Sequence, residues 1–132
     1  MNAHQDNLSV SFLLRYVASV GYHELSVNGR QASEAVLLPS ISYLPKRVLY
    51  RTYNVTHLLK PGEENVIGIW ASAGWATYPN LDHGIATMGT LVLARLEVSG
   101  PGGGSPFAVV TDHTWKAHDS TTRHLGGNYS IG

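Results

Sequence analysis

The chain has no cysteine among its 132 residues, which excludes a disulfide framework and a thiolate metal site. This absence fits either redox compartment, so the localisation is left open. Nine basic and nine acidic side chains cancel, and we therefore expect neither nucleic acid nor an anionic membrane surface as a partner. The chain also lacks the segments of a signal peptide and any run of about 20 apolar residues, so we expect a soluble chain.

The motifs of common catalytic sites are also missing. The chain contains no GxSxG, P-loop, HExxH or dinucleotide-binding motif. Its acidic residues lie mostly in expected turns or solvent-facing strand positions, such as Glu63 and Glu64 beside Pro61, so we predict no catalytic residue. The seven histidines lack the i, i+4 spacing of a helical metal site, and we expect them to be scattered over the surface.

No helical periodicity extends over ten residues, whereas several segments alternate or are rich in strand-forming residues. In the first of these, residues 13–20, one face is wholly apolar and the other is mixed. The apolar face is expected to point inward, and it consists of Leu14, Tyr16, Ala18 and Val20. Leu25 and Val27 continue this inward face. The dipeptide Asn28-Gly29 then predicts a type I′ hairpin, because both of its central residues need positive φ.

A strand, a helical turn and a second strand follow. Residues 48–55 are rich in β-branched and aromatic side chains, and Thr56 is expected to cap a single helical turn over 57–60. Pro61-Gly62 ends that turn, and residues 65–71 are predicted to form a strand that is buried on both faces. Gly68 would mark a bulge or a close approach of another backbone.

The second half of the chain contains two further strand signals. Residues 91–98 and 107–110 are apolar runs separated by the glycine-rich segment 99–106, which we interpret as a mobile surface loop. A turn at 111–114 follows, and Trp115 is expected to begin another short strand. The pattern as a whole predicts an all-β, jelly-roll-like sandwich with one short helical turn.

Three segments carry a family signature: GYHELSVNG at 21–29, RVLYRTYNVTHLLKPGEENVIGIWASAGW at 47–75 and TDHTWK at 111–116. In this order they resemble the N-terminal β-sandwich domain of bacterial α-L-rhamnosidases, and the resemblance covers roughly residues 13 to 118. The sugar-binding sandwich of β-galactosidase-type hydrolases shares only the hairpin and the YxVTxLLKxGxN element. The resemblance implies a galactose-binding-like fold.

The resemblance also implies an accessory role. In α-L-rhamnosidases the hydrolytic residues lie in a separate α-helical barrel domain, so this chain alone is expected not to be an enzyme. The expected partners are a rhamnose-containing glycan or the neighbouring catalytic domain of a glycoside hydrolase. One departure from the family pattern occurs at 73–76, where Ala-Gly-Trp-Ala replaces a GNGWY-like run. The amide before the glycine and the aromatic residue after the tryptophan are therefore missing.

The segment 75–84 is the candidate carbohydrate-binding surface, because loops often carry binding residues. An aromatic platform and planar polar groups suit a sugar ring and its hydroxyls. The candidate residues are Trp75, Tyr78, Asn80, Asp82 and His83. Asn80 and Asp82 also offer hard oxygen ligands for calcium, which some rhamnosidase sandwich domains use to bind L-rhamnose.

The alternative interpretation is that Trp75 anchors the edge of the core and that the rest of the segment is loop. Trp70 and Trp115 are expected to belong to the core, as are four tyrosines whose hydroxyls would reach the rim: Tyr22, Tyr43, Tyr50 and Tyr53. In this reading the chain is a structural or assembly domain without a ligand.

We expect a single domain over residues 1–132, truncated at one or both ends. A missing strand would leave an unpaired sheet edge, and such an edge could pair with another copy of the chain in a homo-oligomer.

Overall fold

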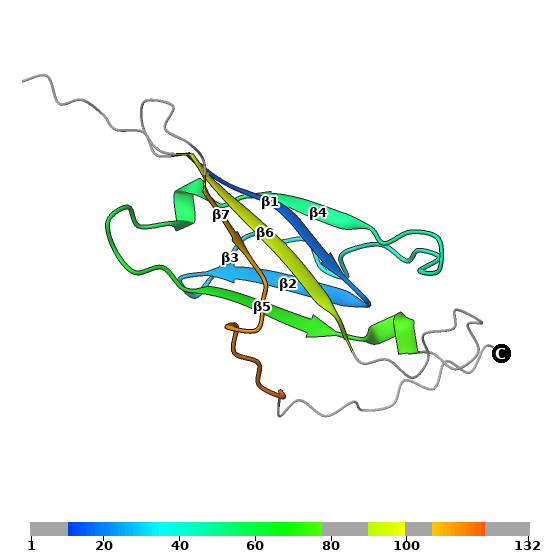
Figure 1. Cartoon of the computed structure of the whole chain (residues 1–132). Helices are drawn as coiled ribbons and strands as arrows, with labels where there is room; N and C mark the ends of the chain where they lie inside the picture. Colours follow the sequence, from blue (N-terminus) through cyan, green and yellow to red (C-terminus); the bar gives the residue numbers. More distant parts are fainter. Residues whose placement is uncertain (1–10, 78–89, 100–106, 121–132) are drawn as a thin grey trace, which may run out of the picture.

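The computed structural model describes residues 11–77, 90–99 and 107–120, and these form two packed antiparallel sheets (Figure 1). The four-stranded sheet has the order β4-β1-β6-β7, and the three-stranded sheet has the order β3-β2-β5. The strands are β1 (Ser11–Ser19), β2 (Tyr22–Val27), β3 (Arg30–Gln31), β4 (Tyr50–Asn54), β5 (Ile67–Ser72), β6 (Val92–Ser99) and β7 (Phe107–Val110). The predicted all-β sandwich is confirmed.

The core lies between the two sheets and draws on both. Its buried side chains come from alternate positions of β1, β2, β4 and β6 and from the segment after β4: Val17, Leu25, Val27, Tyr53, Val55, Leu58, Ala94 and Leu96. Burying a valine or leucine side chain stabilises the folded state by about 1.5–3 kcal/mol relative to leaving it exposed. These residues therefore fix which face of each strand points inward.

The inward face of β1 differs from the prediction. Val17 and Ser19 are buried, whereas Tyr16 is exposed on the opposite face. Val20, just after the strand, is buried as predicted. The reason for the difference is a bulge between Leu14 and Tyr16, where the pairing with β6 shifts by one residue. A one-residue shift moves the following side chains to the other face of the sheet. The expected continuation at Leu25 and Val27 is correct, since both are buried.

The hairpin at Asn28-Gly29 forms as predicted. Asn28 has φ of 52° and Gly29 has φ of 76°, and Val27 pairs with Arg30 across the turn. The Asn28 side chain also reaches a distant loop: its Nδ2 donates to the carbonyl oxygen of Leu58 (2.9 Å) and to Oδ1 of Asn65 (2.9 Å). Its Oδ1 accepts from the backbone N–H of Val66 (3.0 Å). The hairpin is thus tied to the turn that precedes β5.

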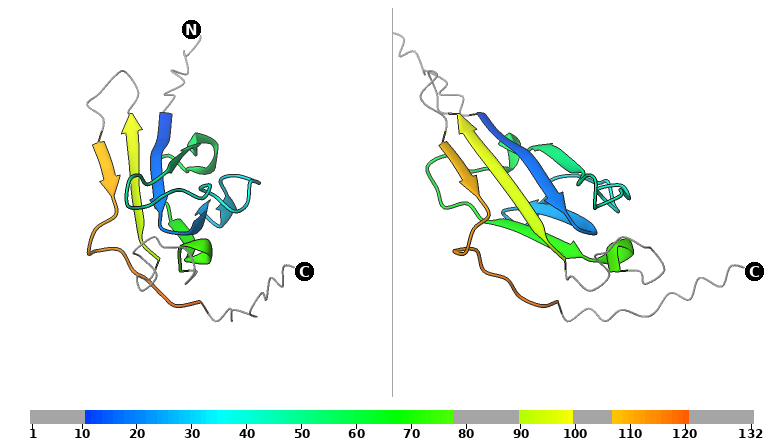
Figure 2. Two further views of the ribbon diagram at one scale, coloured as in Figure 1. Left: turned by 90° about the vertical axis from the view of Figure 1, so that its right-hand side faces the viewer. Right: turned by 45° about the vertical axis from the view of Figure 1, so that its right-hand side comes forward.

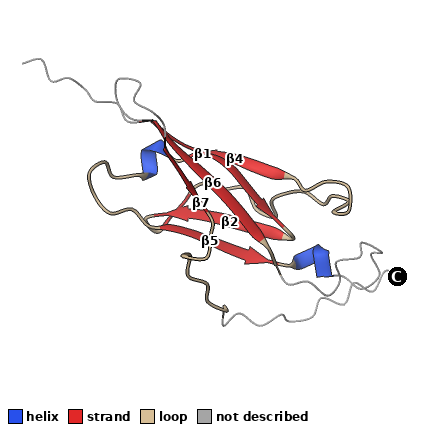
Figure 3. Cartoon of the chain, in the orientation of Figure 1, coloured by secondary structure: helices blue, strands red, loops and turns tan. Residues whose placement is uncertain are grey.

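Two short 3-10 helices are present, η1 (Thr56–Leu58) and η2 (Gly74–Thr77), where one helical turn was expected. Figure 3 shows them at opposite ends of the sandwich. The expected cap was also misplaced. Thr56 is the first residue of η1, and its backbone N–H donates a hydrogen bond to Oδ1 of Asn54 (3.1 Å). Asn54 therefore organises the start of the turn.

β5 was expected to be buried on both faces, and this is wrong. Ile67 and Ile69 pack against the core, but Val66 and Trp70 are exposed, because only one face of the three-stranded sheet meets the core and alternate residues point to solvent. Gly68 allows a close approach as predicted, but the group that approaches is a side chain rather than another backbone, and the strand has no bulge there. A Cβ there would lie 2.8 Å from Oγ of Ser26, which donates to the Gly68 carbonyl.

The chain after β7 does not form the short strand expected at Trp115. Residues 111–115 make a turn, and residues 116–120 have no regular structure (Figure 2). Trp115 is half-buried, with its Nε1 donating to the carbonyl oxygen of Val110 (3.1 Å). Among the tyrosines predicted to pack, Tyr53 is buried and Tyr22 is half-buried, but Tyr43 and Tyr50 are exposed. Most of the predicted loop at 99–106 lies outside the described residues.

Candidate functional site

Trp75 lies in η2, at one end of the sandwich, where two glycines set the position of the turn. A Cβ on Gly21 would collide with the carbonyl oxygens of Ser72 and Ala73, and a Cβ on Gly74 would collide with the ring of Tyr22. The chain can therefore pack closely at this end only because both positions are glycine. η2 follows directly from β5, and its turn is closed by a bond from the N–H of Ala76 to the carbonyl of Ala73 (2.9 Å).

The side chain of Trp75 is half-buried and packs against a small apolar cluster of Val20, Leu44 and Ala76. This placement agrees with an anchoring role at the edge of the core. The other candidate residues, Tyr78, Asn80, Asp82 and His83, lie outside the described residues, and so does the proposed calcium pair. The carbohydrate site expected at 75–84 therefore stays a prediction.

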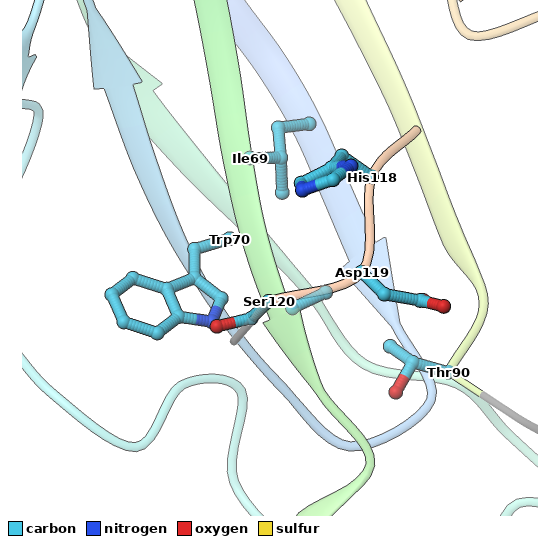
Figure 4. Close-up of a pocket in the computed structure, with 7 residues that line it drawn as sticks. Ile69, Trp70, Thr90, His118, Asp119 and Ser120 are labelled. Carbon is cyan, nitrogen blue, oxygen red and sulfur yellow. The ribbon is translucent and has the colours of Figure 1, made fainter. Parts of the chain in front are cut away.

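Trp70 forms one wall of an open groove beside β5. The groove has a volume of about 590 Å³, and its described lining consists of Ile69, Trp70, Ala71, Thr90, His118, Asp119 and Ser120. Residues 118–120, from the irregular segment after β7, provide most of its polar side chains. Figure 4 shows the Trp70 indole on one side, Asp119 and Thr90 on the other, and Ser120 between them. We call this the Trp70 groove.

The indole of Trp70 is 59% exposed and projects from the outer face of the three-stranded sheet. Its cross-strand partner on β2 is Glu24, and the neighbouring pair on the same face is Ser26 and Gly68. Gln31 of β3 donates to the Glu24 carboxylate (3.3 Å). The tryptophan is thus bordered by planar polar groups on the sheet and by the 118–120 segment at its edge.

The outer face of the four-stranded sheet has the opposite character. Tyr50 on β4, Ala18 on β1 and Leu93 on β6 stand side by side in register. In the next row, Tyr16 on β1 pairs with Arg95 on β6, and Arg95 pairs with Val110 on β7. The Tyr16 ring meets the Tyr50 ring edge-on, with the ring centroids 5.0 Å apart. Apart from Arg95, the large members of this group are exposed aromatic or aliphatic residues, and we call these four the apolar face: Tyr16, Tyr50, Leu93 and Val110.

A buried polar network joins β1, β2 and β4. Oγ of Ser19 donates to the carbonyl oxygen of Gly21 (3.1 Å) and lies 2.8 Å from Nδ1 of His23, and Nε2 of His23 lies 3.0 Å from the hydroxyl of Tyr53. His23 is 3% exposed, so the expectation that all histidines lie on the surface is wrong for this residue. The alternation with Leu25 and Val27 was the signal that places it inward.

Burial lowers the pKa of His23 below its usual value of 6.5, and Arg51 lowers it further. Because the single Ser19 proton is donated to Gly21, Ser19 accepts from Nδ1–H of His23. The unprotonated Nε2 then accepts from Tyr53, whose pKa is raised by burial. This arrangement satisfies every member of the network, and Ser19, His23 and Tyr53 are all buried, so we assign it a structural role.

Asp112 has a structural role in the 111–115 turn. Its Oδ1 accepts from the backbone N–H of Thr114 (2.8 Å) and from the Thr114 hydroxyl (2.6 Å), and these bonds lower the pKa of the carboxyl group. Thr111 ties the same turn to Ala94 of β6. No group of three or more metal-ligating side chains occurs in the part of the chain that the structure describes. No described helix is long and apolar enough to cross a membrane.

The two packed antiparallel sheets define the molecule as a β-sandwich module. The family model for the α-L-rhamnosidase N-terminal domain matches residues 10–129. The chain therefore belongs to the α-L-rhamnosidase N-terminal domain family, as the sequence motifs indicated.

Individual proteins agree with this assignment. One α-L-rhamnosidase of Formosa agariphila is 31% identical over 105 residues, which is 77% of this chain and 11% of that protein. A second from the same organism is 29% identical over 88% of this chain and 12% of its own length. The crystal structure of Streptomyces avermitilis α-L-rhamnosidase complexed with L-rhamnose shares the fold, with a TM-score of 0.62 at 24% identity over 85% of this chain and 11% of that one.

The chain thus spans about a ninth of the relatives it matches. It corresponds to their N-terminal accessory domain and is not the catalyst by itself.

Proposed function

We propose that the chain is a non-catalytic module of an α-L-rhamnosidase-like glycoside hydrolase that packs on the catalytic part through the apolar face. The observation that carries this function is the exposure of four large side chains on one sheet surface, with Leu93 70% and Tyr50 58% exposed. Contiguous apolar patches on soluble proteins commonly mark interaction sites. The tyrosines suit such a site because they combine a large apolar ring with a hydroxyl that tolerates water.

The polar pair within this surface fits the same role. Nε of Arg95 lies 3.0 Å from Oε1 of Glu97, and both side chains stand on the outer face of β6. Because they pair with each other, covering the face would not leave either charge unpaired, which is the costly outcome in a buried interface. Covering this pair costs desolvation, but less than burying either charge alone would.

The test uses a polypeptide that contains both this domain and the catalytic part. Leu93→Glu places a charge at the centre of the apolar face, and a buried unpaired charge is strongly unfavourable. We expect limited proteolysis to separate the domain from the enzyme about tenfold faster in this variant. Val36→Glu is the control, because Val36 is 66% exposed and lies in a loop, two residues from Leu38, which pairs with His23 of the other sheet. Equal rates for wild type and Leu93→Glu would contradict the docking function.

A second candidate function is binding of a rhamnose-containing glycan by the segment 75–84. It is supported by the position of Trp75, which is half-buried at the end of the sandwich, and by a relative of the same fold that is complexed with L-rhamnose. Tyr78, Asn80, Asp82 and His83 would supply the sugar contacts, and Asn80 and Asp82 would supply oxygen ligands to calcium.

An amide NMR titration of the chain with L-rhamnose, with and without calcium, tests this second candidate. We expect saturable shifts in residues 75–83 that weaken when calcium is removed. Trp75→Ala should abolish the shifts while the spectrum stays well dispersed. A dispersed wild-type spectrum that L-rhamnose leaves unchanged in this segment would favour a purely structural domain.

A further inference from the structure

Trp70 is in an unusual position for a side chain that the sequence assigns to the core. Its indole is 59% exposed, yet its neighbours along the outer face of the three-stranded sheet are Glu24, Ser26 and Gln31. An exposed indole leaves a large apolar surface in water, and covering that surface with a ligand would be favourable. Trp70 thus offers a flat apolar surface that a ligand could cover.

The groove next to Trp70 has the properties of a small-molecule site. Its volume of about 590 Å³ falls in the range of about 300–1,000 Å³ that is typical for such sites. It combines one flat aromatic wall with hydroxyl, imidazole and carboxylate groups from Thr90, His118 and Asp119. A few convergent polar groups beside an apolar wall favour a ligand that has both an apolar face and hydrogen-bonding groups.

We propose that the Trp70 groove binds a neutral glycan, with the C–H face of one pyranose ring on the Trp70 indole. The carboxylates of Asp119, within the groove, and of Glu24, across the strand from Trp70, accept hydrogen bonds from sugar hydroxyls. None of the groove's described lining residues belongs to the segment 75–84, and Trp70 lies on the sheet opposite the apolar face. The site therefore does not rest on the docking function.

The charges near the groove favour a neutral ligand over an anionic one. Its described lining includes Asp119 and no lysine or arginine, and Glu24 borders the indole. A phosphate or a nucleic acid would meet carboxylates and no cation. A quaternary ammonium ligand would match the charge, but recognition of such cations uses a cage of several aromatic rings. Trp70 is the only tryptophan, tyrosine or phenylalanine among the described lining residues.

The experiment is an amide NMR titration of the whole 132-residue chain with L-rhamnose, methyl galactoside and methyl glucoside, and with choline as the cationic probe. The indole N–H signals of the three tryptophans report separately once Trp→Phe variants have assigned them. At least one sugar should give saturable shifts of the Trp70 indole and of residues 118–120. These shifts are distinct from any response in residues 75–83, so the two glycan sites can fail independently.

Trp70→Ala should weaken sugar affinity at least about tenfold, and Trp70→Phe should retain part of it, because an aromatic ring remains. Asp119→Ala, in the irregular segment, should weaken binding without affecting either sheet. Phe107→Ala is the matched control, since Phe107 is also an aromatic residue with 59% exposure but lies on β7. It should bind like wild type.

Three results would overturn the proposal. The first is the absence of saturable Trp70 shifts with all three sugars. The second is sugar binding that survives Trp70→Ala unchanged. The third is a Trp70 response to choline alone, which would assign the groove to a cation.

Discussion

His23 is the residue whose environment has the clearest consequence for stability. Both of its ring nitrogens are engaged in the folded protein, Nδ1 by Ser19 and Nε2 by Tyr53, and the imidazole is buried and neutral. Protonation would require Nε2 to become a donor toward the Tyr53 hydroxyl and would place a charge in the core near Arg51. The folded state therefore resists protonation more than the unfolded chain does.

The stability of the domain should accordingly fall in acid. Because the folded pKa of His23 is below the unfolded value of 6.5, the unfolded state binds the extra proton first. The contribution of His23 is complete above about pH 6.5 and is lost as the pH falls from there toward the folded pKa, by at most about 1.4 kcal/mol per pH unit. Urea unfolding at about pH 7.5 and about pH 5.5 measures this loss.

Two variants separate this effect from general acid sensitivity. His23→Gln should be less stable than wild type at neutral pH but should lose less stability between the two pH values. His57→Gln removes an exposed histidine and should keep the wild-type dependence. If His23→Gln and wild type lose stability equally, another group is responsible for the acid sensitivity.

Some side-chain positions could be predicted from the sequence and others could not. Strand alternation places His23 on the same face as Leu25 and Val27, and it places Trp70 on the face opposite Ile67 and Ile69. The two-residue period therefore predicts both positions. The contribution of residues 118–120 to the groove could not be predicted from the sequence. It depends on the path of an irregular segment, which no periodic pattern encodes.

At the scale of elements, the link between the Asn28-Gly29 hairpin and the turn before β5 organises one end of the molecule. Asn65 completes this link: its Oδ1 accepts from the N–H of Lys60 (2.8 Å), and its Nδ2 donates to the carbonyls of Lys60 (2.8 Å) and Glu63 (2.9 Å). Together with the Asn28 bonds to Leu58, Asn65 and Val66, these contacts join two of the three family motifs. The motif residues at this end thus connect the hairpin to the turn before β5.

Asn28 should therefore contribute to stability in two separable ways. Asn28→Gly keeps the ease of positive φ but loses the side-chain bonds, and we expect a loss of about 1–3 kcal/mol. Asn28→Ala loses the same bonds and adds roughly 1–2 kcal/mol for left-handed backbone in a residue with a Cβ. Urea unfolding measures both. An Asn28→Gly variant as stable as wild type would show that the bonds to the distant loop contribute nothing.

The elements themselves were largely predictable, because strands and tight turns are encoded by local composition. The hairpin, the helical turn after β4 and the strands β6 and β7 occur where the sequence places them. The bulge in β1 was not visible, since it depends on pairing with β6, about 80 residues away along the chain. The missing strand after Trp115 has a similar cause: strand-like residues form a strand only where a neighbouring edge is available for pairing.

At the scale of the whole molecule, the two outer faces of the sandwich differ in kind. The three-stranded sheet presents Glu24 and Ser26 beside Trp70, whereas the four-stranded sheet presents the apolar face of Tyr16, Tyr50, Leu93 and Val110. The net charge is zero, so charge repulsion does not keep copies of the chain apart. In the isolated chain the apolar face has no catalytic part to cover it, and a second copy offers the same apolar surface.

The isolated chain should therefore self-associate as its concentration rises, and Leu93→Lys should shift this association to at least about tenfold higher concentration. The substitution places a charge at the centre of the apolar face, where desolvating it opposes contact between copies. Val36→Lys adds the same charge at an equally exposed loop position and should associate like wild type, so net charge alone would not explain the difference. Sedimentation velocity over a range of concentrations measures the effect. Association that responds equally to both variants would mean that copies meet elsewhere, for example along a sheet edge such as β5, which in the described residues pairs only with β2.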